Sequence, residues 1–236
     1  MARTECGTLW MEIAGAACGL TCAGALWLPR SRTLALGDLH LEKGSSRARR
    51  GELLPPYDTR HTLDRLDAEL ERWRPSTLVL MGDSFHDPRA VARLLPEDAL
   101  RLAGLALGRR LVWIEGNHDT RRGETALGGA LPGEVADEVV VEGLTLRHDP
   151  LPGARPGEVS GHLHPAARVS AAGRAVRRKC FATDGERLIL PAFGAYTGGL
   201  NLTDPAFAGL FTRPPIAAML GTDKVRPVPW SALLPD

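Results

Sequence analysis

Several features are scarce in this chain of 236 residues, and each scarcity excludes a class of protein. Aromatic residues make up 5% of the chain, and its four cysteines form neither a CxxC pair nor an extracellular disulfide framework. Lys and Arg number 29 against 28 for Asp and Glu, so the net charge of +1 gives no global attraction to nucleic acid or anionic membranes. The apolar stretch from Ile13 to Leu28 is interrupted by glycine and is too short to span a bilayer. We therefore expect reduced thiols, a cytoplasmic location and no membrane segment.

The composition is typical of a globular protein, with 44% hydrophobic and 24% charged residues. A folded chain of this length buries roughly 70% of its unfolded surface, so its core needs no structural metal. Any metal would then serve chemistry. We predict a single domain over residues 1–236, with a core at about 33–200, an N-terminal hairpin and a proline-rich C-terminal tail.

The first half of the chain repeats one pattern, in which a short apolar run ends in glycine and polar residues and a helical pattern follows. The apolar runs are Thr33–Leu36, Thr77–Met81 and Leu111–Glu115. Leu and Ala recur at helical spacing over Asp58–Trp73 and Arg89–Leu107. Alternating strands and helices predict parallel βαβ units.

After Asp119 the pattern changes to short strands separated by glycine and proline, which predicts an antiparallel or mixed second half. These strands are Glu134–Val141, Leu144–Arg147, Glu158–Ser160, Ala175–Ala182 and Arg187–Leu190. At the N-terminus, Gly19-Leu20 suits the turn of a hairpin.

Residues that bind hard cations follow the predicted strands. The motifs are GDLH with Asp38 and His40, GDSFHD with Asp83, GNHD with Asn117, then the isolated His148, and GHLH with His162 and His164. Six of the seven histidines fall in these segments, and only His61 lies outside them. In an α/β sheet ligands bind beyond the carboxyl ends of strands, so we expect these side chains to converge. The i, i+2 pairs would point the same way in extended backbone.

This ordered set of motifs resembles the calcineurin-like metallophosphoesterase superfamily. The resemblance implies an α/β fold, a four-layer αββα sandwich with mixed central sheets, and two divalent metal ions at the edge of the sheets. One metal would be held by Asp38, His40, Asp83 and His164, and the other by Asp83, Asn117, His148 and His162. Asp83 would then bridge the two ions.

The mixture of carboxylate, amide and imidazole ligands suits Mn²⁺, with Fe or Zn²⁺ as alternatives. Two such cations activate water as hydroxide and stabilise the charge that develops during attack on phosphorus, so no side-chain nucleophile is required. The family pattern leaves His118 free of metal. We interpret it as the group that stabilises the phosphoryl oxygen or protonates the leaving group, with Asp119 fixing its tautomer. A structural role for His118 is the alternative.

A narrower resemblance covers nearly the whole chain. The segments ALWLPRSRTLALGDLHLEKG, RRGELLPP, GDSFHD, GHLHP and LPAFGAYTGG are similar to the PdeM-type, ligase-associated DNA damage response endonucleases of bacteria. This resemblance implies DNA as substrate and a DNA ligase and a helicase as partners. The chain departs from the expected pattern where GDLH and LEKG stand, which leaves the metal motifs intact.

Substrate contacts are harder to predict from the residues. His86 would rim the site or pack beneath its loop, and Arg47, Arg49 and Arg50 would bind phosphate or form an ordinary solvated face. The segment from Phe193 to Gly199 suits a loop near the site or a turn that packs a core phenylalanine.

The preferred hypothesis is a dinuclear-metal phosphodiesterase or endonuclease acting on nucleic acid in DNA repair. The alternatives are a phosphatase or phosphodiesterase of small nucleotides and a non-catalytic scaffold. Retention of His118 and of every ligand type argues against the scaffold.

Overall fold

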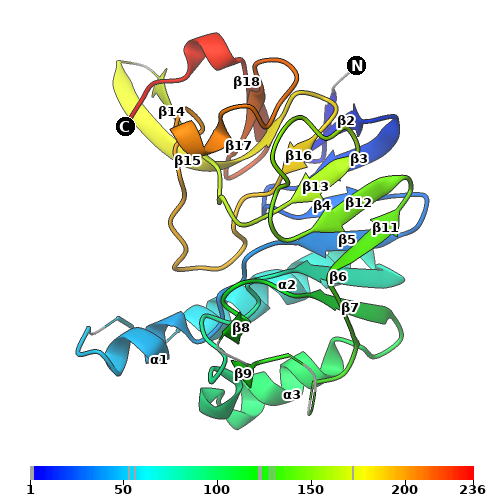
Figure 1. The fold of residues 1–236 in the computed structure, drawn as a ribbon, viewed down its shortest axis with the longest axis vertical. Coiled ribbons are helices and arrows are strands. Elements are labelled where there is room, and N and C mark those ends of the chain that lie inside the picture. The colour runs from blue at the N-terminus through cyan, green and yellow to red at the C-terminus, as the bar shows by residue number, and fades with distance from the viewer. Residues whose placement is uncertain are drawn as a thin grey trace.

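A computed structural model describes residues 3–52, 54–55, 57–121, 124–127, 129, 131–171 and 173–236. Two mixed β-sheets pack face to face, and helices cover the outer face of the first sheet (Figure 1). The architecture is therefore a mixed α/β sandwich, as the sequence predicts. None of the described helices is long and apolar enough to cross a membrane.

The first sheet has the order β1-β2-β3-β4-β5-β6-β7-β10. Its strands are Arg3–Glu5 (β1), Thr8–Ile13 (β2), Ala16–Leu20 (β3), Leu26–Leu28 (β4), Thr33–Leu36 (β5), Thr77–Met81 (β6), Arg110–Ile114 (β7) and Glu134–Ala136 (β10). Strands β1 to β5 pair antiparallel, whereas β5, β6, β7 and β10 are parallel. The parallel part is the predicted βαβ region.

The second sheet has the order β11-β12-β13-β16-β15-β17-β18, and β14 pairs with β15. Its strands are Glu138–Val141 (β11), Leu144–Arg147 (β12), Glu158–Ser160 (β13), Ala166–Ala171 (β14), Arg174–Thr183 (β15), Leu188–Ile189 (β16), Ile216–Leu220 (β17) and Val225–Val228 (β18). Strands β12, β13 and β16 are parallel. A separate two-stranded ribbon joins Thr120–Arg121 (β8) to Glu124–Thr125 (β9).

The helices are α1 (Lys43–Ala48), α2 (Asp58–Trp73) and α3 (Pro96–Gly104), with 3₁₀ turns η1 (Val91–Arg93), η2 (Pro205–Phe207) and η3 (Trp230–Ala232). Alternation within the strands separates the core into layers, because successive side chains point to opposite faces. In β6, Leu78 and Leu80 pack with α2, while Val79 and Met81 pack between the sheets. The outer face of the second sheet packs against the segment that contains η2, which is built from turns.

Three local predictions were wrong. The helix expected over Arg89–Leu107 is divided into η1 and α3, because Pro96 disfavours helical backbone in the residue before it, and Leu95 is extended. The strand expected over Glu134–Val141 is two strands, β10 and β11, which belong to different sheets. Gly19 and Leu20 lie inside β3, and the preceding turn is made by Ala14 and Gly15 in left-handed backbone.

Candidate metal centre

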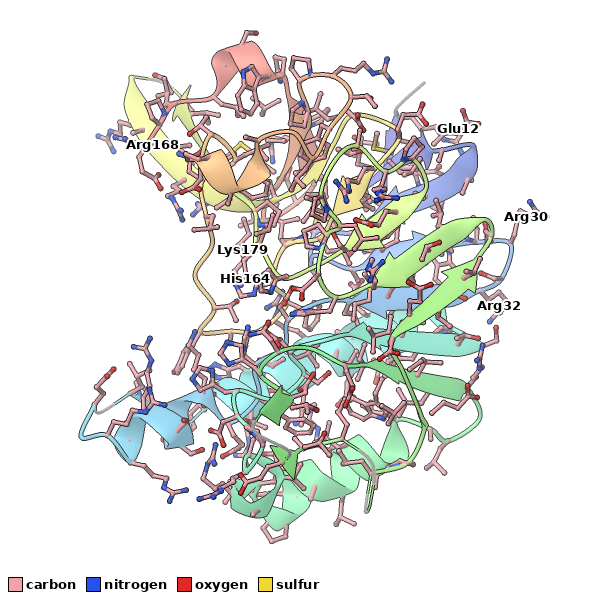
Figure 2. The ribbon with its side chains drawn as sticks, in the orientation of Figure 1. Glu12, Arg30, Arg32, His164, Arg168 and Lys179 are labelled. Atoms are coloured by element: carbon pink, nitrogen blue, oxygen red, sulfur yellow. The ribbon has the colours of Figure 1, made fainter. Side chains whose placement is uncertain are left out.

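The seven predicted metal ligands come together between the two sheets, and they follow the carboxyl ends of parallel strands. Asp38 and His40 follow β5, Asp83 follows β6 and Asn117 follows β7. The second sheet contributes His148 after β12, and His162 and His164 after β13. In Figure 2, His164 lies in the interior of the view, whereas Arg30 and Arg168 lie at its periphery.

The first cluster consists of Asp38, His40 and His164, whose ligand atoms all lie within 4.8 Å of one another. The Nε2 atoms of His40 and His164 are 3.3 Å apart, and His164 Nε2 is 3.2 Å from Asp38 Oδ1. Asp38 is fully buried, and its carboxylate accepts the backbone N–H of His162. This hydrogen bond ties the first sheet to the second at the ligands themselves.

The second cluster consists of Asp83, His148 and His162. His148 Nε2 is 3.4 Å from Asp83 Oδ1 and 3.1 Å from Asn117 Oδ1, and His162 Nδ1 is 3.2 Å from His148 Nε2. The other carboxylate oxygen of Asp83, Oδ2, lies 3.6 Å from His40 Nε2 in the first cluster. Asp83 thus presents one oxygen to each cluster, as a bridging ligand requires.

The chemistry of these atoms fits a pair of divalent cations. His148 Nδ1 donates to the Met81 carbonyl at 3.1 Å, so Nε2 is the nitrogen that faces the oxygens of Asp83 and Asn117. Nitrogen and oxygen atoms that face one another at this distance repel unless a proton or a metal cation lies among them. Carboxylate, amide and imidazole ligands suit first-row divalent metals, and second-shell hydrogen bonds of this kind orient metal-bound histidines.

Burial and charge set the protonation of these groups. Burial, followed by the positive charge of neighbouring groups, lowers the pKa of His40, which favours the neutral imidazole that binds metal. Burial raises the pKa of Asp83. Burial lowers the pKa of His148, but the carboxylates of Asp38 and Asp83 outweigh it, so this pKa is raised overall. The buried carboxylates therefore stabilise a positively charged group or ion in the centre.

The backbone of the ligands differs from the predicted extended conformation. Asp38, His40, Asp83, His162 and His164 all have left-handed backbone, with φ between 45° and 63°. The members of each i, i+2 pair converge through this conformation and not through a strand. Left-handed backbone costs a non-glycine residue roughly 1–2 kcal/mol, so the surrounding hydrogen bonds and packing must hold these five residues in place.

Motif glycines allow the ligands to approach closely. A Cβ on Gly116 would lie 2.2 Å from the Asp83 nitrogen, and one on Gly161 would lie 2.6 Å from Asp38 Oδ2. A Cβ on Gly82 would lie 2.3 Å from His148 Nδ1. Gly82, Gly116 and Gly161 therefore each leave the space that a ligand of another motif occupies.

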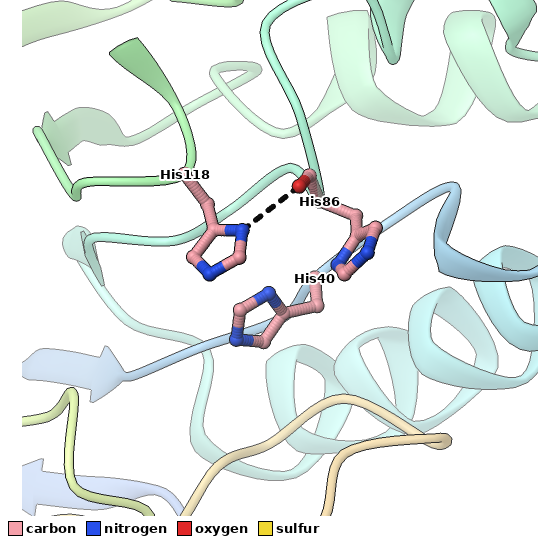
Figure 3. A group of neighbouring side chains, drawn as sticks. All are labelled: His40, His86 and His118. Atoms are coloured by element: carbon pink, nitrogen blue, oxygen red, sulfur yellow. Dashed lines mark hydrogen bonds between the residues drawn. The ribbon is translucent and has the colours of Figure 1, made fainter. Parts of the chain in front are cut away.

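His118 lies beside the clusters with its ring partly exposed. Its Nδ1 donates to the His86 carbonyl at 2.9 Å (Figure 3). This leaves Nε2 4.0 Å from Asp83 Oδ2. The rings of His118 and His86 are stacked with centroids 5.3 Å apart, and His40 meets His118 edge to face. Burial, followed by nearby positive charge, lowers the pKa of His86 to about 4, so His86 is neutral near pH 7.

The prediction that Asp119 fixes the tautomer of His118 is wrong, because the His86 carbonyl does so. Asp119 is fully buried and accepts the backbone N–H groups of Ser84, Phe85 and Gly116. Burial raises its pKa to about 7, although these three N–H groups oppose the shift. Asp119 thereby joins the loop after β6 to the loop after β7 and positions Asp83 and Asn117.

The predicted substrate residues divide between two hollows. Arg47, Arg50 and His86 line a cleft of about 540 Å³ together with Asn117 and His118. Arg49 lines a different hollow, of about 820 Å³, beside Arg89 and Val91. Of the three predicted arginines, Arg47 and Arg50 share the cleft of the metal centre and Arg49 does not.

The loop over residues 192–199 satisfies both interpretations left open by the sequence. Phe193 is fully buried, with the Arg65 guanidinium 4.5 Å from its ring centroid. Gly194 packs directly on the Leu39 carbonyl, and Gly199 packs on that of His164, where a Cβ would lie 2.1 and 2.2 Å away. The loop therefore supports both His40 and His164 from outside the cleft.

Sequence reasoning missed two residues near the centre. Lys179 stands in a basic run that suggests a solvated face, but its Nζ donates to the carbonyls of Ala192 and Gly194 and to Thr197 Oγ1. Burial lowers its pKa to about 8. Asp149 directly follows His148, and its Oδ1 lies 2.9 Å from His162 Nδ1. The only sequence signal for Asp149 was an acidic residue next to an isolated histidine.

Comparison with known proteins identifies the family of this chain. The family model described as Calcineurin-like phosphoesterase matches residues 31–180, a stretch that contains all seven predicted ligands. The chain is similar to the crystal structure of Pseudomonas putida nuclease MPE, with 29% identity and a TM-score of 0.71 over 96% of this chain and 100% of that chain. It also aligns with YfcE, a phosphoesterase from E. coli, with 16% identity and a TM-score of 0.40 over 84% and 98% of the two chains. No curated protein matches.

Proposed function

This chain belongs to the calcineurin-like phosphoesterase family and is a metal-dependent phosphoesterase, and from that premise we propose that it cleaves phosphodiester bonds in nucleic acid. The observation that carries the proposal is the single cleft shared by Arg47, Arg50, His118 and the ligand Asn117. Guanidinium groups bind phosphate oxygens in a bidentate manner. A cleft that contains them beside a metal centre suits a substrate with several phosphates.

The seven ligands would hold two divalent cations, which would supply the reacting water by lowering its pKa and would neutralise charge on the phosphoryl oxygens. We propose Mn²⁺ as the native metal, since the ligand set mixes oxygen and imidazole without thiolate. Asp83, which directs one oxygen toward each cluster, would contribute to both ions.

The proposed role of His118 is to protonate the leaving group. Because its Nδ1–H is held by the His86 carbonyl, the ring presents Nε2 to the site, and when Nε2 also carries a proton, that proton can pass to the departing oxygen. The stacked, neutral ring of His86 restricts His118 to this orientation. His118 is thus the proposed general acid, and His86 is its positioning residue as well as part of the cleft wall.

Arg47 and Arg50 bind phosphates away from the reacting one. Arg47 lies in α1 and Arg50 follows its C-terminal end, and Arg93 links that helix to the loop after β6 by hydrogen bonds to Ser45 and Asp87. The likeness to a nuclease supports a polynucleotide substrate. We further propose that the protein acts on DNA in repair, in the cytoplasm, with a DNA ligase and a helicase as partners.

The test separates phosphate binding from chemistry. In a variant with Arg47→Ala and Arg50→Ala, oligonucleotide cleavage should fall and the slope of log affinity against log salt should decrease by roughly two, about one for each arginine removed. Hydrolysis of a nitrophenyl phosphodiester should barely change, because this substrate carries one phosphate. Arg49→Ala is the matched control and should behave like the parent, since Arg49 lies in the other hollow.

Two results would contradict the proposal. If the double variant cleaves oligonucleotides like the parent at every salt concentration, these arginines do not bind substrate. If the parent prefers small nucleotides to oligonucleotides at equal phosphate concentration, the second candidate function, a phosphoesterase of small nucleotides, replaces the first.

A further inference from the structure

Asp149 lies at the solvent side of the second cluster and faces its ligand nitrogens. Its Oδ1 is 2.9 Å from His162 Nδ1 and 3.9 Å from His148 Nε2. The side chain is 61% exposed, whereas that of Asp83, on the inner side of the same cluster, is 3% exposed. The two carboxylates therefore approach the same pair of imidazoles from a solvated and a buried position.

We propose that Asp149 is an additional ligand of the second metal ion, a role that rests on the dinuclear centre of the proposed function. Asp149 lies outside the ligand set that the sequence motifs define. Its carboxylate is a hard oxygen donor, which binds divalent cations such as Mn²⁺ readily.

The hydrogen-bonding state of the cluster supports this role. His148 directs Nε2 into the cluster, because Nδ1 donates to the Met81 carbonyl. His162 Nδ1 faces that nitrogen at 3.2 Å and the Asp149 carboxylate at 2.9 Å. A single proton on His162 Nδ1 can satisfy one of these acceptors. A divalent cation satisfies the lone pairs of both imidazoles and the carboxylate together.

Charge balance supports it as well. The predicted ligand set of the first metal has two carboxylates, Asp38 of the first cluster and the shared Asp83, whereas the predicted second set has only Asp83, together with the neutral Asn117 and two imidazoles. Asp149 gives the second ion a carboxylate of its own. With Asp83 shared between the ions, each cation then has one private and one shared anionic ligand.

The backbone around Asp149 is held in place even though its side chain is exposed. The buried Arg187 donates to the Leu151 carbonyl at 2.6 Å and forms a salt bridge with the buried Glu158. Glu158 in turn accepts the Leu151 N–H, and the His148 carbonyl accepts the Gly161 N–H. The segment from His148 to Leu151 is thus anchored on both sides of Asp149, which keeps the carboxylate near His162 at a low entropy cost.

The experiment measures metal binding without substrate. The full-length chain, freed of metal by a chelator, is titrated with Mn²⁺ by calorimetry, and electron paramagnetic resonance detects the magnetically coupled Mn²⁺ pair. For Asp149→Ala we expect the first equivalent to bind as in the parent and the second to bind roughly 10–100-fold more weakly, with loss of the coupled signal at Mn²⁺ concentrations that saturate the parent. Asp149→Asn, which keeps an oxygen without the charge, should lie between them.

The control is Asp223→Ala, which removes a carboxylate of similar exposure, 62%, that pairs with Arg226. It should bind two equivalents as the parent does. Unchanged circular dichroism of the metal-free variants verifies the fold, and Asp149→Asn, which preserves shape, keeps the test decisive if Asp149→Ala is unstable. Parent-like affinity for the second Mn²⁺ in both Asp149 variants would overturn the proposal alone. A parent chain that binds a single equivalent would overturn the dinuclear centre, and with it the proposed function.

Discussion

The two sheets contribute to the metal centre in different ways. The first sheet supplies the carboxylates Asp38 and Asp83, whose side chains are 0% and 3% exposed. The second sheet supplies imidazoles, of which His148 is 4% exposed and His164 and His162 are 19% and 38% exposed. The anionic ligands thus lie deep, whereas two of the second-sheet imidazoles reach toward solvent. A buried carboxylate without a partner is costly, so the first-sheet side depends on the cations more than the second-sheet side does.

This difference predicts that replacing Asp83, from the first sheet, weakens the binding of both ions. Replacing His162, from the second sheet, should weaken the binding of one. Asp83→Asn should lose both metal equivalents and reduce turnover by roughly 10³-fold or more, because an amide cannot give one anionic oxygen to each cluster. His162→Gln should lose the second equivalent only. Metal analysis and phosphodiester turnover of the two variants check this. If Asp83→Asn still bound two full equivalents of metal, Asp83 would not be the bridging ligand, and the proposed difference between the two sheets would be wrong.

The next largest effect belongs to His118, a first-sheet residue outside the ligand set. His118→Ala should keep both metal equivalents and lose roughly 10²–10⁴-fold in turnover of substrates with poor leaving groups, since it removes the general acid. Nitrophenyl esters should be affected much less, because nitrophenolate departs without protonation. An equal loss with both kinds of substrate would indicate electrostatic stabilisation in place of proton transfer.

A smaller effect tests how tightly the first-sheet loops are packed. Gly116→Ala places a Cβ against the backbone and carboxylate of Asp83 and should destabilise the fold by about 1–3 kcal/mol, with weaker Mn²⁺ binding. Gly104→Ala is the matched control, because nothing lies within 4 Å of a Cβ there, and it should change the free energy of unfolding by less than about 1 kcal/mol. Chemical denaturation measures both. Equal stability of the two variants would show that the loop containing Asp83 moves readily to accommodate the added Cβ.

The smallest effect concerns Lys179, which supports the centre from the second sheet. Burial lowers its pKa from 10.5 to about 8, so between these values the unfolded chain holds a proton that the folded chain has released. The contribution of Lys179 to stability therefore rises with pH through this window and is lost as pH falls through about 8. Relative to Lys179→Met, the parent should gain free energy of unfolding from pH 8 to 10. The control, Arg178→Met at the exposed neighbour, should show the same pH dependence of stability as the parent. If the free energies of unfolding of the parent and Lys179→Met differ by the same amount at every pH, the pKa of Lys179 is not lowered by folding.

Local sequence patterns predicted the parallel strands and the first long helix well. They failed where the pairing of strands in the folded protein decides the element boundaries. Strands Thr33–Leu36 and Thr77–Met81 and helix Asp58–Trp73 occur as predicted, since apolar runs and helical spacing are local properties. The sequence predicts one strand over residues 134–141 because the whole stretch favours extended backbone. The break after Ala136 exists because one half pairs with β7 and the other with β12.

The same limit applies to the site. The motifs predicted which residues converge, because the carboxyl ends of parallel strands meet at one edge. They did not predict the left-handed backbone of five ligands, the burial of Asp119 among three N–H groups, or the exclusion of Arg49 from the cleft. Each of these depends on how one loop packs on another. The predicted single domain and cytoplasmic location stay predictions.

The sequence by itself determined the chemistry of the centre: which oxygen and nitrogen ligands exist, their order along the chain, and their places at strand ends. The tertiary structure alone decided how those ligands are shared. His162 N–H reaches Asp38 across 124 residues, and His148 reaches the Met81 carbonyl across 67. Contacts over such separations depend on the packing of the two sheets, because no local pattern fixes which loop faces which. That packing gives each oxygen of Asp83 to a different cluster and brings Asp149 to the imidazoles of the second.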